Sequence, residues 1–456
     1  MREWSNGSFP SGGARTAVVD STAGKPCGWR VRSRATETVD VSTEQTMEAV
    51  LGRDNLRRAY RVVRRNGGVG GIDGRSIRDS AAHLRSHWAV IEERLLTGQY
   101  QPSPVRGVHL PKADGGTRLL GIPTVQDRVI QQAVAQCLNV KADAGFSAHS
   151  YGYRPGRGAH DAVRAAQGYV QAGKNWVVDL DISAFFDEVD HDILMHRVGQ
   201  LVRDKRILRL IGRYLRAPME VSGQRHKRDR GTPQGGPLSP LLANIYLDPL
   251  DRELERRGLS FCRYADDVKI YVGSERSADR VLGSLTAWIE KHLKLRVNRS
   301  KSGTGRPWQK PFLGFRIRGD GRIGVAESSV ARFKAEVRRL WNAQQNATSA
   351  ELVAQWQRYL RGWCNYFGLA AVRSPLYRLE GWIRRHMRKC FWTRWHNRHG
   401  RRWALRRLGA KPRQLRLASS RRGAWRIAAS PTLQSVLDNR TLTRYGLWTP
   451  SLLWAA

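Results

Sequence analysis

The chain has 456 residues with 79 Lys and Arg against 39 Asp and Glu, so its formal net charge is +40 at pH 7. This length predicts about two to four domains with buried cores, and the charge favours a polyanionic partner such as nucleic acid. The apolar runs are far shorter than the ~20 residues that span a bilayer, and the five cysteines are scattered without a C-x-x-C pair. We therefore expect a soluble protein of a reducing compartment, with no membrane partner, no disulfide framework and no cysteine-rich zinc module.

The first part of the chain reads as an extension followed by helices. Residues 1–40 contain no Leu and no Ile but many Gly, Ser, Thr and Arg, which predicts a disordered basic extension over 1–44. It has no apolar core of a secretory signal peptide, so export is not expected. Helical spacing of apolar residues predicts helices over about 45–66 and 76–97, separated by the glycine-rich segment 67–71.

Strands alternate with helices between about 105 and 320, which predicts an α/β or α+β enzyme body. A buried strand over 176–182 ends in acids, among them Asp181. Two further strand-like runs, 259–264 and 268–272, flank Ala265, Asp266 and Asp267 as a tight hairpin with two acids at its tip. A solvated turn is the alternative for such a pair. If Asp181 and the tip converge, the three carboxylates need divalent cations, and oxygen ligands suit Mg²⁺ and two-metal nucleotidyl transfer.

Two loops add candidate nucleotide contacts. A Gly-Gly turn lies between Lys112 and Arg118, so a hairpin could fold over a triphosphate, although an ordinary charged hairpin has the same pattern. The segment 231–237 is too rich in Gly and Pro for a helix and keeps Gln234 on a close-approach loop. A helix is expected after it, with Ser239 as its cap and an apolar stripe that begins at Leu238.

The last part of the chain is predicted to be helical and basic. Strand signals fade after Gly319, and helices are expected over 326–370. Residues 380–456 carry 18 Lys or Arg and 2 Asp or Glu. Ile383, Met387, Cys390 and Phe391 form an apolar stripe, so the basic residues beside it face either phosphate or solvent. Nine of the 16 Trp lie from Trp356 onward, and we expect most of them in the core.

Several motifs in order resemble one family, the reverse transcriptases encoded by group II introns. Tyr264-Ala265-Asp266-Asp267 looks like the catalytic box of these enzymes. Segment 111–123 is similar to the fingers motif, 150–157 to the motif after it, 179–191 to the first carboxylate motif, 231–240 to the template and nucleotide motif, and 312–315 to the last palm strand. Residues 358–392 resemble the maturase domain, which in this family doubles as the polymerase thumb.

The resemblance implies an α+β, right-hand polymerase fold. The expected domains are a disordered extension (1–44), fingers and palm (45–320), a thumb/maturase domain (321–392) and a basic DNA-binding-like tail (393–456). The chain ends without the nuclease module of longer relatives, so an existing 3′ end is expected as primer. The expected location is the bacterial cytoplasm, near the nucleoid.

The resemblance also assigns roles to residues. The expected catalytic and metal-binding residues are Asp181, Asp266 and Asp267, which would hold two Mg²⁺ ions. The expected nucleotide-binding residues are Lys112, Arg118, Phe186 as a sugar gate, Gln234 and Lys301. The expected nucleic-acid-binding residues are Arg384, Arg385, Arg388, Lys389, Arg421, Arg422 and Arg426.

The function that these assignments imply is RNA-directed DNA synthesis, with help in splicing and retrohoming of the intron. The partners would be group II intron RNA, a DNA target and primer strand, and deoxynucleoside triphosphates. Two alternatives remain: a splicing maturase without polymerase activity, and a reverse transcriptase recruited to another role such as host defence. The sequence gives no indication of the oligomeric state.

Overall fold

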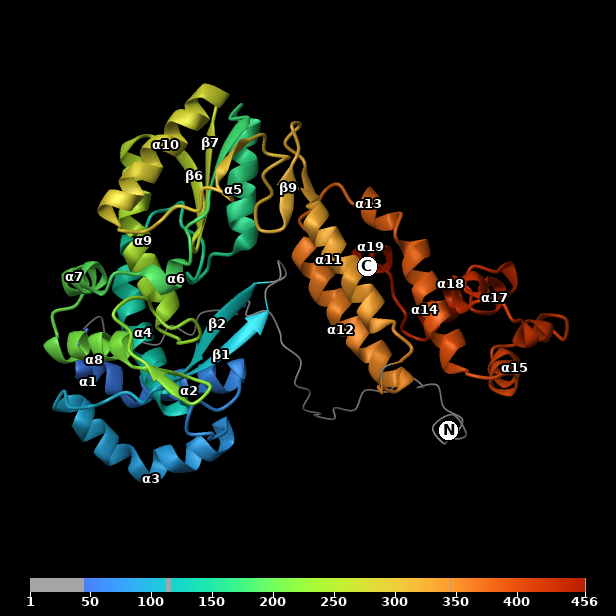
Figure 1. Cartoon of the computed structure of the whole chain (residues 1–456), viewed down its shortest axis with the longest axis horizontal. Helices are drawn as coiled ribbons and strands as arrows, with labels where there is room; N and C mark the ends of the chain where they lie inside the picture. The colour runs from blue at the N-terminus through green and yellow to red at the C-terminus, as the bar shows by residue number, and fades with distance from the viewer. Residues whose placement is uncertain (1–44, 112–115, 345, 456) are drawn as a thin grey trace. The chain divides into compact units, whose positions relative to one another are not determined.

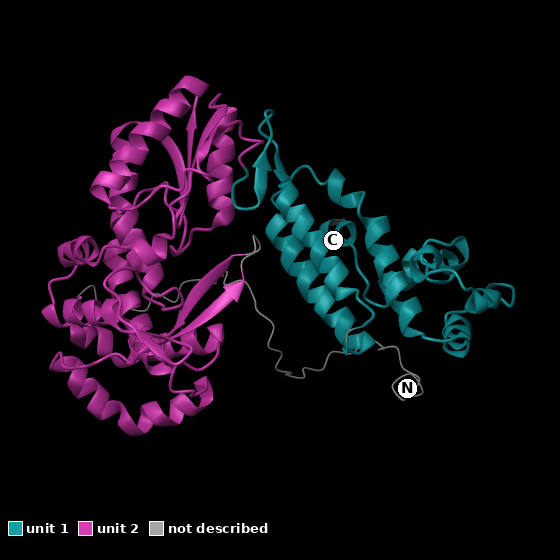
Figure 2. Cartoon of the chain, in the orientation of Figure 1, with its two compact units in different colours: residues 1–27, 311–456 teal, residues 28–310 magenta. Residues whose placement is uncertain are grey.

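The computed structural model describes residues 45–111, 116–344 and 346–455 (Figure 1). The expected extension 1–44 and the candidate Lys112 lie outside these residues. The chain divides into two compact units, one ending at Lys310 and the other beginning at Pro311 (Figure 2). This division lies close to the domain boundary expected at residue 320. Among the described residues, no helix is long and apolar enough to cross a membrane.

The unit that ends at Lys310 begins with helices whose apolar faces meet in one core. The helices of this region are α1 (Met47–Leu51), α2 (Arg53–Asn66), α3 (Ile77–Leu96), α4 (Val125–Gly145), α7 (His191–Leu201) and α8 (Lys205–Arg216). Helix α4 lies among α1, α2, α3 and α7, and most of its side chains are buried. The helices expected over 45–66 and 76–97 are thus confirmed as α1 to α3.

A buried carboxylate joins three segments of this helical region. Asp127 on α4 is 1% exposed. Its Oδ1 accepts hydrogen bonds from the hydroxyls of Tyr100 (2.8 Å) and Tyr214 (3.2 Å), and its Oδ2 accepts from the Thr124 hydroxyl (2.7 Å) and the Ser103 backbone N–H (3.2 Å). Four donors on one carboxylate offset the cost of its burial.

The first sheet carries the candidate fingers hairpin. Its strands are β1 (Val105–Pro111), β2 (Thr117–Ile122), β4 (Met219–Val221) and β5 (Gln224–His226), in the order β2-β1-β4-β5. β1 and β2 are antiparallel, with Leu110 opposite Arg118.

The second sheet is antiparallel and forms the palm. Its strands are β3 (Trp176–Leu180), β6 (Ser260–Tyr264), β7 (Asp267–Val272) and β8 (Gly303–Gly305), in the order β6-β7-β3-β8. The helices that pack on it are α5 (Ala159–Gln171), α9 (Ser239–Arg256) and α10 (Glu275–His292), and the short α6 (Phe185–Glu188) follows β3. The expected strand over 176–182 and the hairpin with its tip at 265–267 are confirmed. Phe312 to Phe315 is not a strand of this sheet, contrary to expectation, because β9 (Phe315–Ile317) pairs with β10 (Ile323–Val325) instead.

Helix α9 begins one residue earlier than predicted, at Ser239 rather than after it. Its apolar stripe, from Leu238 to Ile245, is buried as expected. Ser239 does not cap the helix, however. It is the first helical residue, and its hydroxyl donates to the carbonyl of Pro233 (2.8 Å) and accepts from the Thr232 hydroxyl (2.8 Å). Ser239 therefore fastens the preceding loop to the helix.

The unit that begins at Pro311 is mostly helical. After β9 and β10 its elements are α11 (Glu327–Leu340), α12 (Ser349–Phe367), α13 (Ser374–Tyr377), α14 (Glu380–Arg394), α15 (Arg398–Arg407), a 3₁₀ helix over Gln414–Ser419, α16 (Ala424–Ile427), α17 (Pro431–Val436), α18 (Asn439–Arg444) and α19 (Pro450–Ala455). Aromatic rings fill its core. Phe333 packs against Trp356 and Trp363, and Trp341 packs against Trp356 and Phe391. Of the nine tryptophans from Trp356 onward, only Trp356, Trp363, Trp392 and Trp395 are buried, so the expectation that most of them lie in the core is not met.

The end of the chain folds back on α12 and α14. The Trp356 indole N–H donates to the carbonyl of Trp448 (2.9 Å), and the Trp454 indole N–H donates to the carbonyl of Cys364 (3.1 Å). The Ser451 backbone N–H donates to Glu380 on α14 (2.7 Å). Residues 393–455 are therefore folded as part of this unit rather than as a separate tail.

The Asp127 contacts lead to a stability prediction. Asp127→Asn should lower the free energy of unfolding by about 2–3 kcal/mol, because the amide NH₂ turns a donor toward buried donors that need an acceptor. Asp54→Asn is the matched control, since the Asp54 side chain is 77% exposed. Urea unfolding followed by circular dichroism measures both. Equal midpoints for the two variants would contradict the role of the buried carboxylate.

Candidate functional site

The three candidate catalytic acids lie at one end of the palm sheet. β3 and β7 are antiparallel with Leu180 opposite Val268, so the next pair in register is Asp181 and Asp267. Asp266 precedes Asp267 in the turn between β6 and β7, where Ala265 has a φ of 59°. Two segments more than 80 residues apart thus bring their carboxylates together.

The pKa shifts of these acids reflect electrostatic repulsion between their carboxylates. The pKa of Asp267 is raised to about 6, chiefly by burial, with repulsion from Asp179, Asp266 and Asp181 adding to the rise and Lys269 opposing it. Repulsion of this kind is relieved by a cation held between the carboxylates.

The pKa of Asp266 is raised as well, again chiefly by burial and then by Asp181. Arg118 on β2 and Arg263 on β6 oppose that rise. Arg118 therefore lies within electrostatic reach of the catalytic tip, although its side chain comes from the other sheet.

A buried lysine divides the carboxylates into two sets. Lys269 on β7 is 3% exposed, and its ammonium forms an ion pair with Asp179, directly opposite on β3. The same Nζ lies 3.7 Å from Asp267 Oδ1. Asp179 is thus paired, and the charge of Asp267 is partly compensated. Asp181 and Asp266 are the carboxylates best placed to meet a metal ion.

The donor set fits Mg²⁺ as an open site. Within the described ranges, no group of three or more His, Cys, Asp or Glu side chains is arranged to hold a metal ion. Mg²⁺ does not need such a group, because it usually keeps several waters and binds through one or two carboxylates together with substrate phosphates. Asp181 and Asp266 offer only oxygen donors, and their mutual repulsion favours a hard cation.

The turn after residue 297 holds the backbone of Asp181. The Asp181 backbone N–H donates to the Ser302 hydroxyl (2.9 Å), and the Asp181 carbonyl accepts from the backbone N–H of Asn298 (2.9 Å). Lys301, the candidate near the leaving group, precedes Ser302 in this turn and is exposed. Lys301 is therefore the sequence neighbour of Ser302, whose side chain contacts the backbone of Asp181.

The loop that carries Gln234 is packed against the fingers hairpin. The Gly121 backbone N–H on β2 donates to the carbonyl of Gln234 (2.8 Å). Gly235 has a φ of 129°, and a Cβ on it would overlap the carbonyl oxygen of Gly121. Gln234 itself is half-buried. Glycine is needed here both for the backbone angle and for the close approach.

Phe186, the candidate sugar gate, is 8% exposed, whereas Phe185 is 2% exposed. The two rings meet edge to face at 5.2 Å, and Phe185 also packs on Tyr246. The Phe186 carbonyl accepts from the backbone N–H of Thr232 (2.7 Å), so the position of Phe186 is coupled to the Gln234 loop. Both rings belong to the core, and Phe185 is the more deeply buried of the two.

The candidate nucleic-acid contacts near the end of the chain fall into two groups. Arg421, Arg422 and Arg426 are exposed. The second group faces a cavity of about 450 Å³ that Arg384, Arg385, Arg388, Gln434 and Asn439 help to line.

The arginines that line the cavity also form contacts with other residues of the same unit. Arg385 donates to the carbonyl of Trp425 (2.9 Å), and Arg388 donates to the carbonyl of Leu437 (2.8 Å). Arg384 pairs with Glu380 (3.0 Å), and Lys389 is half-buried. Arg385 and Arg388 thus fasten the last part of the chain to α14, a role that the sequence did not indicate.

Sequence reasoning missed two basic residues of the palm. Arg263 is 0% exposed and Lys269 is 3% exposed, each within a strand of otherwise buried residues. A charged residue inside such a strand needs a partner, and this was the available signal.

Comparison with known proteins agrees with this geometry. Residues 110–317 match the family described as reverse transcriptase (RNA-dependent DNA polymerase), and residues 330–409 match the maturase-specific domain of group II introns. Protein YkfC of Escherichia coli is 32% identical over an alignment that covers 51% of this chain and 71% of YkfC. The group II intron-encoded protein LtrA of Lactococcus lactis is 34% identical, over 51% of this chain and 39% of LtrA.

A solved partial Cas6-RT-Cas1–Cas2 complex contains a chain that is 26% identical with a TM-score of 0.35, covering 54% of this chain and 42% of that one.

The palm sheet with its acidic tip and the family match define a reverse transcriptase, an RNA-directed DNA polymerase. Because a maturase-specific domain follows in the same chain, the protein belongs to the group II intron-encoded reverse transcriptases.

Gly152 provides a test of how closely the segment 150–157 approaches the turn between β6 and β7, which contains Ala265 and Asp266 and is called the catalytic turn below. A Cβ at Gly152 would overlap the backbone nitrogen of Ala265. Gly152→Ala should therefore shift the turn and lower kcat for primer extension by at least about tenfold.

Gly168→Ala is the control, because Gly168 lies in α5 with no atom within 4 Å of the added Cβ. Steady-state primer extension compares the two variants. Unchanged kcat in Gly152→Ala would show that the close approach is not required.

Proposed function

We propose that this protein copies RNA into DNA from the 3′ end of a primer. The observation that carries the proposal is the register of β3 and β7, which sets Asp181 beside the Asp266–Asp267 tip. Asp181 and Asp266 would hold Mg²⁺ there. When bound, Mg²⁺ would supply activation of the primer 3′-hydroxyl and stabilisation of the departing pyrophosphate.

The protein's own residues position the substrates. Arg118 and Lys112 bind the triphosphate, which suits a planar guanidinium and a point charge. Gln234 contacts the incoming nucleotide or its neighbouring base through its amide, held by the bond between its carbonyl and Gly121. Phe186 packs against the sugar where a 2′-hydroxyl would not fit, and Lys301 supplies a positive charge and a proton for the leaving group.

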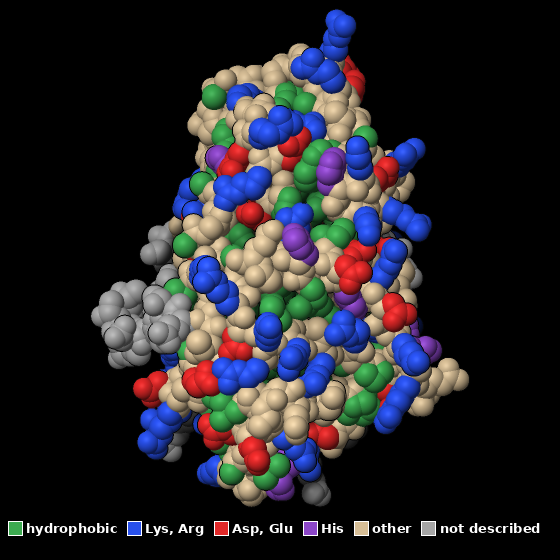
Figure 3. Space-filling view, turned by 90° about the vertical axis from the view of Figure 1, so that its left-hand side faces the viewer, with side chains coloured by type: hydrophobic (Ala, Val, Ile, Leu, Met, Phe, Trp, Pro, Cys, Tyr) green, Lys and Arg blue, Asp and Glu red, His purple; other side chains and the backbone are tan. Residues whose placement is uncertain are grey.

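We further propose that the protein assists splicing and retrohoming of a group II intron RNA. The maturase-specific domain and the surplus of basic residues support this role. On the unit that ends at Lys310, Lys and Arg are spread across the displayed face among fewer acids (Figure 3). On the other unit, Arg421, Arg422 and Arg426 are exposed to contact phosphate.

The two roles should separate by mutation. Asp266→Ala combined with Asp267→Ala should abolish primer extension, because Asp266 would hold Mg²⁺ and Asp267 lies beside it, while intron RNA binding and splicing stay nearly unchanged. Glu275→Ala with Glu290→Ala removes the same two charges from α10 and should leave extension intact. Equal loss of splicing in the folded tip variant would show that the two functions share one site. RNA binding and splicing without extension in the unaltered chain would favour a maturase that lacks polymerase activity.

The affinity for intron RNA should depend steeply on salt. Each phosphate contact releases counterions, so log K should fall by about 0.7–0.9 per contact for each tenfold rise in salt. Fluorescence anisotropy over a salt series measures the slope. An affinity that barely changes with salt would remove charge as the basis of RNA binding.

A further inference from the structure

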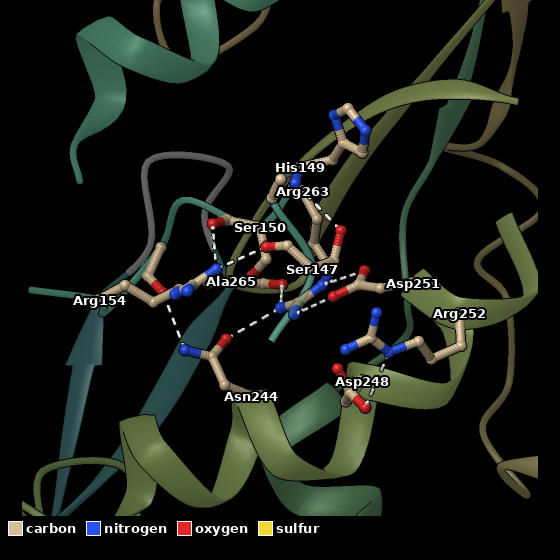
Figure 4. Close-up of polar contacts among 12 residues, drawn as sticks. Ser147, His149, Ser150, Arg154, Asn244, Asp248, Asp251, Arg252, Arg263 and Ala265 are labelled. Carbon is tan, nitrogen blue, oxygen red and sulfur yellow. Dashed lines mark hydrogen bonds and ion pairs between the residues drawn. The ribbon is translucent and has the colours of Figure 1, made fainter. Parts of the chain in front are cut away.

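A buried polar network lies directly behind the catalytic turn (Figure 4). At its centre is Arg263, which is on β6 three residues before Asp266. Arg263 and Asp251 of α9 form an ion pair in which both side chains are 0% exposed. The pair is bidentate, with Arg263 Nε 2.7 Å from Asp251 Oδ1 and Nη2 2.6 Å from Oδ2.

The other terminal nitrogen of Arg263 reaches the catalytic turn. Nη1 donates to the backbone carbonyl of Ala265 (3.0 Å) and to the side-chain oxygen of Asn244 (2.9 Å). Ala265 has a φ of 59° and lies between β6 and the tip acids. A residue in this conformation persists only where its surroundings hold it, and the guanidinium is one such constraint.

Asn244 links the same network to the segment 150–157. Its amide donates to the carbonyl of Gly152 (2.9 Å). Gly152 in turn lies so close to Ala265 that a Cβ on Gly152 would overlap the Ala265 backbone nitrogen. The backbone of Arg263 itself bonds to this region, since its N–H donates to the carbonyl of His149 (2.9 Å) and its carbonyl accepts from the N–H of Tyr151 (2.8 Å). The turn is thus held from the helix side and from the loop side at once.

Stability alone is a weak reason for such an arrangement. A buried ion pair costs desolvation, and apolar residues of similar volume often stabilise a fold as well or better. What an apolar replacement would not provide is a rigid fork that fixes the Ala265 carbonyl relative to α9.

We propose that Arg263 is a positioning residue for DNA synthesis, oriented by Asp251 and Asn244, which sets the place of the Asp266 carboxylate by holding the Ala265 carbonyl. Because its side chain is 0% exposed, Arg263 acts through its bond to the turn and not by direct contact with a substrate. The inference rests on the proposed polymerase activity. Because a displacement of about 1 Å at a reacting centre can cost 10²-fold in rate, the loss of this bond should appear in kcat.

The test compares Arg263→Lys with Arg263→Lys/Asp251→Glu. Lysine keeps the charge, but its single ammonium lacks the fork that serves Asp251 and Ala265 together. Arg263→Lys should lower kcat for primer extension by about 10- to 100-fold, with KM for deoxynucleotides and primer-template within about twofold. The longer glutamate should repair the ion pair, so the double variant should regain thermal stability without regaining kcat. Recovery of kcat together with stability would overturn the proposal, because Arg263 would then serve only the fold.

Arg213→Lys is the matched control. Arg213 also clamps two backbone carbonyls, those of Gly98 (2.6 Å) and Tyr100 (2.8 Å), but it lies on α8 in the helical region. Its variant should lower stability and leave kcat within about twofold of the unaltered protein. A fall in kcat equal to that of Arg263→Lys would mean that any lost clamp slows synthesis, and would contradict a specific role for Arg263.

A second readout does not depend on polymerisation. Amide hydrogen exchange over residues 260–270 should accelerate at the turn in Arg263→Lys and remain unchanged in Arg213→Lys. Unchanged exchange at the turn would overturn the positioning role even if synthesis is impaired. If the unaltered protein extends no primer while the turn still loosens in Arg263→Lys, the polymerase proposal fails and the structural coupling stands.

Discussion

The pairing of β3 with β7 is the constraint on which the candidate site depends. It sets Asp181 opposite Asp267 and beside Asp266, and like charges at such separations repel strongly where water is scarce. A fold tolerates this arrangement only if positive charge is supplied. Lys269 supplies part of this positive charge from within the sheet, and Arg118 and Arg263 contribute from nearby. A bound cation would compensate the negative charge that remains.

Charge compensation in the unit that begins at Pro311 follows a different rule. Its last part holds many arginines and few acids, so carboxylates do not account for most of the pairing. Guanidiniums bind backbone carbonyls and lie over indole rings instead. The clearest examples are Arg385 over Trp425 at 4.0 Å and Arg361 over Trp448 at 4.6 Å. A strongly basic sequence thereby folds while exposed arginines such as Arg421 remain for phosphate.

The sequence predicted the features that depend on local pattern. Alternating apolar residues predicted β3 and the β6–β7 hairpin, and the helical stripe from Leu238 predicted α9. It failed where a contact depends on how the elements pack on one another. The apolar pattern does not show that the Ser239 hydroxyl donates to the carbonyl of Pro233, that β9 pairs with β10, or that the Trp356 indole N–H donates to the carbonyl of Trp448. Arg263 was missed for the same reason, since Asp251 becomes its partner only when α9 packs on β6.

The catalytic assignment rests on three acids and a cation acting together, and one assay tests this most directly. Purified protein is given an annealed RNA template and DNA primer with deoxynucleotides, and extension is followed while Mg²⁺ is added or chelated, for the unaltered chain and for Asp181→Asn. The account predicts template-directed extension that requires Mg²⁺ and is abolished in the variant. Extension that survives chelation, or that Asp181→Asn performs as well as the unaltered chain, would contradict it.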